Sequence, residues 1–237
     1  MNSSTRCLVS FFMLFISFVS FSQNNVIDSL QITLKNAQED TAKVNIYNSL
    51  FLEYEFSDVI KAKEILIKAK ELATKINFQK GLLQVYSNAG LLTEDEGNFP
   101  EARNNYNSAL KIAEKLNEKK EIGYCFNNIG RTYFFQDNYP EALKNYFLSV
   151  KIREEIGDKK GLSKSYNNIG IVFLVQGKYP EALKNHFASL KIKEFLKDEK
   201  GVANSYTNIG NVYEHQGNYP DALKNQLASL KIKKTLG

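Results

Sequence analysis

The stretch that decides the fold is residues 161–200, GLSKSYNNIGIVFLVQGKYPEALKNHFASLKIKEFLKDEK, because it recurs along the chain at a spacing of 40 residues. Its opening block aligns without a gap with EIGYCFNNIG from Glu121 and GVANSYTNIG from Gly201. A further copy begins at Gly81, and a degenerate one begins at Thr41. Recurrence of this kind is typical of repeat architectures, in which each unit packs on its neighbours. We therefore divide the chain into five repeats, 41–80, 81–120, 121–160, 161–200 and 201–237.

Each repeat is predicted to form two helices joined by a turn. In 161–200, Tyr166, Ile169 and Phe173 fall on one helical face, and Leu183, Phe187 and Leu190 supply the apolar positions of the second helix. Gly177 suits the left-handed residue that ends the first helix. In neighbouring repeats Asn138 and Asn218 are expected to cap the second helix, with Glu141 and Asp221 three residues later as in a capping box. Second helices are expected to end at Asn117, Gly157 and Lys197.

Small residues recur where the two helices of a repeat must cross. Gly170 and Ala182 stand at such positions, and glycine returns at residues 90, 130, 170 and 210. Glycine inside a helix costs about 1 kcal/mol relative to alanine, so its return indicates that close approach outweighs this cost. The sequence thus predicts an all-α fold, a right-handed α-solenoid of tandem helix-turn-helix hairpins with a concave and a convex surface.

These residues resemble the tetratricopeptide repeat. The third repeat has the family's pattern of large, small and aromatic residues at Phe126, Ile129-Gly130, Tyr133, Ala142, Tyr146 and Ser149. The usual repeat has about 34 residues, and the longer repeat here is similar to those of kinesin light chain and of bacterial peptide-receptor regulators. Similar arrays also form exported sensor regions of bacterial sensor kinases. The resemblance covers residues 41–237 and is weakest in the first repeat.

One asparagine is kept in all five repeats, two residues before the Gly/Ala position: Asn48, Asn88, Asn128, Asn168 and Asn208. Its amide offers both a donor and an acceptor. In related repeats the first helix lines the concave groove and this asparagine pairs with the main chain of an extended peptide. The resemblance therefore implies that these five residues bind peptide. The alternative is that each asparagine bonds a neighbouring helix and only fixes the stacking, and both roles can coexist.

The other positions predicted to line the groove differ between repeats, as specificity positions should. They are Tyr124, Arg131, Phe134 and Phe135 in the third repeat, Lys164, Asn167, Ile171 and Leu174 in the fourth, and Asn204, Asn211, Glu214 and His215 in the fifth. Arg131 and Lys164 are candidates to hold a carboxylate of the ligand. For any one of these residues, the alternative is a solvated surface position.

The first residues do not fit the repeat. Residues 1–22 carry Arg6, then an apolar run of 15 residues from Cys7 to Phe21, and small residues near Ser22, which predicts a secretory signal peptide. An uncleaved membrane anchor is the alternative, although the run is shorter than the roughly 20 residues of a spanning helix. Residues 23–40 form a leading segment with one helix. We expect an exported bacterial protein, periplasmic or secreted.

Neither composition nor motifs indicate catalysis. His186 replaces a tyrosine of earlier repeats and is expected to pack, and Cys125 is expected to be a buried or half-buried thiol. Glu94, Asp95 and Glu96 are interpreted as a solvated helix end. No ligand set for zinc and no phosphate-binding loop is recognisable, and the net charge of +5 is carried by scattered lysines. We expect a non-enzymatic protein without cofactor, metal or nucleic-acid partner.

The leading hypothesis is a scaffold that binds a peptide or protein segment in its concave groove, as the sensory part of a signalling system. Two alternatives are a structural subunit that assembles through apolar end faces and the N-terminal region of a sensor kinase. The last predicted helix keeps an interior pattern at Leu223, Leu227, Leu230 and Ile232. This pattern suggests self-association or further repeats at that edge.

Overall fold

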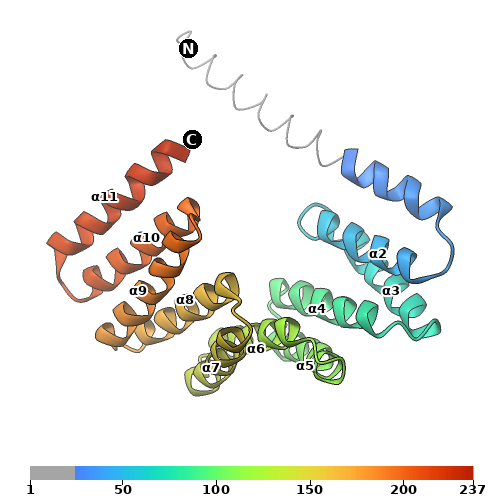
Figure 1. Cartoon of the computed structure of the whole chain (residues 1–237), viewed down its shortest axis with the longest axis horizontal. Helices are drawn as coiled ribbons and strands as arrows, with labels where there is room; N and C mark the ends of the chain where they lie inside the picture. The colour runs from blue at the N-terminus through green and yellow to red at the C-terminus, as the bar shows by residue number, and fades with distance from the viewer. Residues whose placement is uncertain (1–24, 237) are drawn as a thin grey trace, which may run out of the picture. The chain divides into compact units, whose positions relative to one another are not determined.

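A computed structural model describes residues 25–236 of the chain, and this part consists of helices joined by short turns (Figure 1). The predicted signal peptide, residues 1–22, lies outside the described residues. The leading segment does contain a helix, at residues 25–36. Between residues 25 and 236, no helix has both the length and the apolar content required to cross a bilayer.

Two compact units divide the chain between Leu92 and Thr93, inside one helix. The first unit holds the helix at residues 25–36 and then α2 (Thr41–Tyr54), α3 (Val59–Lys75) and most of α4 (Gln79–Asp95). The second unit holds the end of α4 and α5 (Phe99–Lys115), α6 (Lys119–Phe134), α7 (Tyr139–Glu155), α8 (Lys159–Val175), α9 (Tyr179–Phe195), α10 (Glu199–His215) and α11 (Tyr219–Leu236).

The core of the first unit lies between α2, α3 and α4. Phe51 from α2, Leu66 from α3 and Val85 from α4 are buried in one cluster. Ile27 and Leu30 of the leading helix pack against the same cluster. The leading helix therefore covers apolar surface of the first hairpin, as a neighbouring repeat would.

In the second unit, hairpins α6–α7, α8–α9 and α10–α11 follow one another, and each second helix also packs against the first helix of the next hairpin. Tyr146 and Val150 of α7 share a buried cluster with Ile169 and Val172 of α8. Burial of apolar surface stabilises by roughly 25 cal/mol per Å², so most of the stability of a hairpin comes from its neighbours. This confirms the predicted tandem helical hairpins.

The small residues lie where the helices of a hairpin cross. A Cβ atom built on Gly130 would come within 2.9 Å of the Tyr146 ring, and one on Gly170 within 2.7 Å of the His186 ring. Such contacts are shorter than van der Waals distance, so only glycine permits these approaches. The explanation of glycine by close packing is confirmed, and so is the packing role of His186.

Turns and caps follow the sequence signals. Gly177, with φ of 70°, follows the first helix α8, and Asn117, Gly157 and Lys197 have positive φ just after second helices, as expected. Asn138 Oδ1 accepts the Glu141 backbone N–H at 3.3 Å. Asn218 caps α11 in the same way through the N–H of Asp221 at 3.4 Å.

Candidate functional site

The conserved asparagines of the second unit form hydrogen bonds between successive first helices. Asn168 Nδ2 donates to Asn127 Oδ1 at 3.1 Å, and Asn208 Nδ2 donates to Asn167 Oδ1 at 2.7 Å. Donor and acceptor are 41 residues apart in both pairs, because each asparagine meets the residue one position earlier in the preceding repeat. We call this row of side-chain amides the carboxamide ladder.

The ladder fixes the amides but does not saturate them. Asn168 and Asn208 are half-buried, and each uses one N–H in the ladder. Within residues 25–236, neither Asn168 Oδ1 nor Asn208 Oδ1 accepts a hydrogen bond. An amide oxygen can accept two hydrogen bonds. The ladder therefore holds two oriented acceptors on adjacent helices.

In the first unit, the equivalent asparagines bond each other directly. Asn88 Nδ2 donates to Asn48 Oδ1 at 3.2 Å, and Asn48 Nδ2 lies 3.4 Å from Gln84 Oε1. Asn48 is buried, whereas Asn88 is half-buried. The bond between repeats is thus kept even in the degenerate first copy.

Asn128 differs from the other ladder residues because it is almost fully buried. Its Oδ1 accepts from Asn127 Nδ2 at 3.3 Å, while its own Nδ2 has no hydrogen-bond partner among the described residues. Burial raises the pKa of the neighbouring Tyr124 phenol to about 12, with Asn128 opposing part of the rise. The Tyr124 oxygen is therefore close to Asn128, although the geometry falls short of a hydrogen bond. Asn128 thus has a buried donor to spare.

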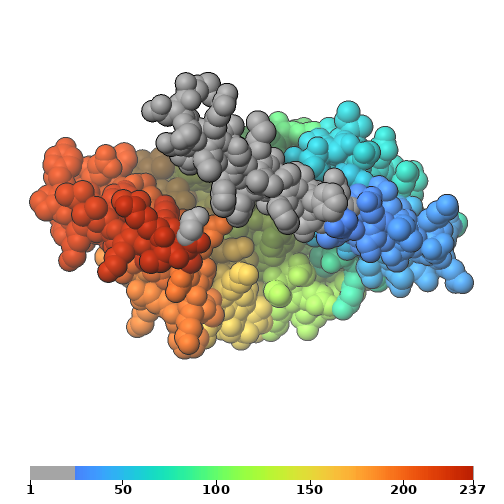
Figure 2. Space-filling view, turned by 90° about the horizontal axis from the view of Figure 1, so that it is seen from above, coloured from blue at the N-terminus to red at the C-terminus, as the bar shows by residue number. Residues whose placement is uncertain are grey.

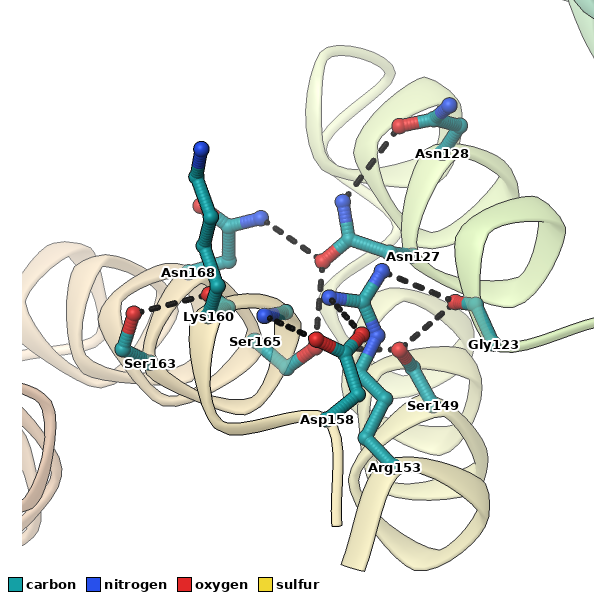
Figure 3. A network of polar contacts seen from close by, with 11 residues as sticks. Gly123, Asn127, Asn128, Ser149, Arg153, Asp158, Lys160, Ser163, Ser165 and Asn168 are labelled. Atoms are coloured by element: carbon teal, nitrogen blue, oxygen red, sulfur yellow. Dashed lines mark hydrogen bonds and ion pairs between the residues drawn. The ribbon is translucent and has the colours of Figure 1, made fainter. Parts of the chain in front are cut away.

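Behind the ladder lies a polar network that the sequence did not suggest (Figure 3). Figure 3 shows Asn127 between Asn128, Asn168 and Ser165. Ser165 Oγ donates to Asn127 Oδ1 at 3.3 Å and lies 2.9 Å from Ser149 Oγ. Ser149 in turn donates to the Gly123 carbonyl at 2.7 Å. The network links α6, α7 and α8 and keeps the Asn127 amide in place.

Arg153 completes the network at the end of α7. It is buried, its Nη2 lies 3.4 Å from the Gly123 carbonyl, and its Nη1 lies 3.7 Å from Asp158 Oδ2. Asp158 is also the N-cap of α8 and accepts from the Gly161 N–H at 2.9 Å. The recurrence of a basic residue at 153, 193 and 233 in the sequence could have indicated this position.

The interpretation of Glu94, Asp95 and Glu96 as a solvated helix end is wrong for Glu94. The Glu94 side chain is buried and forms a bidentate ion pair with Arg131, in which Nε bonds Oε1 and Nη2 lies 2.8 Å from Oε2. The Tyr106 hydroxyl donates to Glu94 Oε2 at 2.9 Å. A buried carboxylate needs such partners, and they come from repeats that sequence proximity does not connect. Arg131 is thus engaged by a carboxylate of the chain itself.

Phe134 and Phe135 belong to an aromatic cluster at the end of α6. The Phe135 ring stacks on Phe99 with centroids 5.2 Å apart, and Phe134 packs edge-on against Phe135 at 5.5 Å. Phe135 stays more than half exposed. The cluster can contact an apolar side chain of a ligand.

The remaining predicted groove residues fall into two classes. Lys164 is exposed, as are Asn204, Glu214 and His215, whereas Tyr124, Asn167, Ile171, Leu174 and Asn211 are half-buried. Asn211 Oδ1 accepts from Gln226 Nε2 at 2.9 Å, which ties it to α11. The structure contains no ligand-like contact at these residues, and their role stays a prediction.

Groups that could support other chemistry are few. Cys125 is a buried free thiol whose pKa burial raises to about 12, which keeps it protonated at neutral pH. Its expected place in the core is confirmed. Across residues 25–236, no group of three or more His, Cys, Asp or Glu side chains is placed to hold a metal ion.

Comparisons with known proteins agree with the arrangement of the helices. The sequence model of the tetratricopeptide repeat matches residues 81–155, 122–194 and 161–235. No curated protein sequence matches the chain. Among solved structures, BtubC (BKLC) from P. vanneervenii is 18% identical with a TM-score of 0.75, and the alignment covers 91% of this chain and 89% of that one.

Two further structures have the same fold. A signal transduction ATPase with numerous domains from Pyrococcus horikoshii, which has a tetratricopeptide repeat sensor, is 19% identical with a TM-score of 0.73, over 85% of this chain and 31% of that one. A Rap protein complexed with Competence and Sporulation Factor is 15% identical with a TM-score of 0.72, over 94% of this chain and 73% of that one. At such identities the likeness concerns the fold alone. Because the matched segments together run over residues 81–235, well over half of the 237 residues, the chain belongs to the tetratricopeptide repeat family.

Proposed function

We propose that this protein is a non-catalytic scaffold that binds an extended peptide segment along the first helices of its second unit. The observation that carries the proposal is the carboxamide ladder, which leaves Asn168 Oδ1 and Asn208 Oδ1 without a partner among residues 25–236. An extended peptide presents backbone N–H groups at regular intervals, and pairing with them requires acceptors that are already oriented. Recognition of this kind is independent of the side chains of the ligand.

Specificity would come from the positions that flank the ladder. Phe135 offers an exposed aromatic face, and Lys164 is an exposed cation without a hydrogen bond or ion pair among the described residues. Because Arg131 is engaged by Glu94, Lys164 is the better candidate to meet a carboxylate. We infer a ligand with an apolar side chain near Phe135 and an acidic group near Lys164.

The comparisons give this proposal a precedent. One similar structure is a Rap protein in complex with Competence and Sporulation Factor, and another carries a tetratricopeptide repeat sensor. Proteins of this family are in general scaffolds. We further propose, from residues 1–22, that the protein is exported and serves as the sensory part of a signalling system.

Selection from a displayed library of random 12-residue peptides tests the proposal. Bound peptides should lose affinity by roughly 10-fold or more in Asn168→Ala/Asn208→Ala, since each hydrogen bond contributes about 0.5–1.5 kcal/mol. Asn104→Ala is the matched control, because Asn104 is exposed on the second helix α5. It should bind as the wild type does.

Ladder stability and recognition are separated by a further variant. Asn127→Ala removes the acceptor of the ladder but leaves the Asn168 amide in place. It should lower the melting temperature while retaining most of the affinity for the peptides. If Asn127→Ala and Asn168→Ala lower affinity and melting temperature equally, the asparagines only fix stacking and the proposal fails.

A further inference from the structure

The second helices α7 and α9 are each covered by the first helix of the following hairpin, α8 and α10. α11 is the outermost helix of its unit in both views of the molecule (Figures 1 and 2), and no described helix follows it. The side of α11 that corresponds to the covered sides of α7 and α9 can be identified from the exposed fractions of equivalent residues.

Leu230 identifies this side of α11. It is 47% exposed, whereas its equivalents Val150 and Leu190 are 8% and 6% exposed. Leu227, in contrast, is 54% exposed, and its equivalents Phe147 and Phe187 are 49% and 44% exposed. The lack of a covering helix therefore changes the burial of Leu230 and leaves that of Leu227 nearly unchanged.

Two more apolar residues of α11 belong with Leu230. Tyr219 and Leu223 are more than half exposed. Their equivalents in α7 and α9 are half-buried, and those in α7 pack in one cluster with residues of α8. We call Tyr219, Leu223 and Leu230 the open face of α11.

The covered junctions also pair a basic residue with an aspartate. Arg153 Nη1 at the end of α7 lies 3.7 Å from Asp158, the N-cap of α8. At the next junction, the equivalent Lys193 lies in the field of Asp198, the N-cap of α10, and donates to Ser205 Oγ at 2.9 Å. Each basic side chain thus meets the start of the covering helix.

Lys233 is the equivalent residue of α11. Its Nζ lies 3.4 Å from Thr207 Oγ1, and no acidic side chain among residues 25–236 pairs with it. A cation and an apolar surface are thus placed next to each other as they are at the two covered junctions.

The two covering helices share a chemistry that defines what fits this surface. Each starts at an aspartate N-cap, has glycine three residues later and serine seven residues later, and buries one isoleucine and one valine against its neighbours. The glycine and serine allow close approach, and the aspartate faces the basic residue.

We propose that the open face of α11 and Lys233 form a docking site for a helix of this kind, the aspartate-capped first helix of a tetratricopeptide-type hairpin on a partner protein. The site continues the pattern of the α7–α8 and α9–α10 junctions. It is separate from the carboxamide ladder and does not depend on peptide binding there.

A second copy of this chain does not supply the helix. α6, α8 and α10 are each packed between two second helices of their own unit, so another copy has no free helix of this type there. Pairing of two α11 helices would bring together surfaces that each carry Lys224, Lys231, Lys233 and Lys234 against one acidic residue, Asp221. Like charges oppose such pairing.

The test uses the full chain with a further copy of residues 198–236 joined after Gly237, which preserves the spacing of 40 residues. The appended helix serves as the probe, and its covalent link makes the docking intramolecular. Hydrogen exchange of the α11 amides is measured with and without the appended copy. The expected result is roughly 10-fold or greater slowing of exchange in α11.

Matched variants assign the effect to the open face. Leu230→Glu should abolish the slowing, whereas Leu227→Glu, at an equally exposed position outside the face, should retain it. Lys233→Glu should reduce the slowing by about 2–5-fold, the usual size for an exposed ion pair. Both leucines are exposed, so these variants are expected to fold.

Three outcomes would overturn the proposal. The first is equal exchange in α11 with and without the appended copy, and the second is equal loss with Leu227→Glu and Leu230→Glu. The third is a dimer of the unextended chain in sedimentation that Leu230→Glu converts to a monomer, because a second copy would then be the occupant. None of these results bears on binding at the ladder.

Discussion

His186 is fully buried in the second unit, and neither of its ring nitrogens has a hydrogen-bond partner among the described residues. Burial, helped by the positive charge of Lys193, lowers its pKa from 6.5 to about 4. The unfolded chain therefore binds a proton at this side chain between pH 6.5 and 4, while the folded chain does not. Stability must fall as the pH drops through this window.

We expect the free energy of unfolding to decrease by up to about 3 kcal/mol from this residue alone between pH 6.5 and 4, since one pKa unit corresponds to about 1.36 kcal/mol. His186→Phe should remove this part of the pH dependence. A six-membered ring, that of Tyr146, packs on Gly130 at the equivalent place, and an apolar ring leaves no unpaired nitrogen. Urea denaturation of both proteins at pH 7, 5.5 and 4 measures the difference. Parallel pH profiles would contradict the assignment to His186.

At the level of single elements, α9 lacks the cap that other second helices have. Asn98 and Asn138 cap α5 and α7 through their side chains, but Lys178 stands at the start of α9 and makes no such bond. The backbone at Lys178, with φ of −86° and ψ of 69°, matches that of Asn138, with φ of −85° and ψ of 69°. Only the side chain is therefore missing from this cap.

Lys178→Asn should stabilise the protein by about 1 kcal/mol, the usual contribution of an asparagine N-cap. Thermal denaturation is the measurement. The same change at Lys184, which is exposed in the middle of α9, should slightly destabilise because asparagine is a poorer helix former than lysine. A gain at Lys184 equal to that at Lys178 would show that loss of positive charge, and not capping, is responsible.

For the whole molecule, stability is built from contacts between neighbouring helices. Ile209 is fully buried in α10, which packs between α9 and α11. In such arrays the effect of a cavity decays with distance along the repeats. The ends of the second unit should therefore respond differently to one deletion.

Ile209→Ala should cost about 2–5 kcal/mol locally. Hydrogen exchange should accelerate most in α10 and α11 and least in α5 and α6 of the same unit. Ser229→Ala, which removes a buried hydroxyl of α11 but little apolar volume, is a milder comparison at the same end. Uniform acceleration over the whole unit would instead indicate a single cooperative block.

The sequence alone determined the helices, their ends and the small residues at the crossings. These features depend on local signals, namely Gly177 in the left-handed conformation, the caps at Asn138 and Asn218, and the glycine that faces Tyr146 or His186. Repetition multiplies each signal, so that its meaning is clear even where one copy is degenerate. The conserved asparagines could be found in the same way.

Only the tertiary structure decided which side chains meet. The Glu94–Arg131 pair joins residues 37 apart, and the ladder joins each asparagine to a different position of the preceding repeat rather than to its own equivalent. Nothing local in the chain encodes these partners, because they depend on the offset at which one hairpin packs on the next. For the same reason the sequence suggested a solvated Glu94 where the packed helices bury it and supply Arg131 and Tyr106 as its partners.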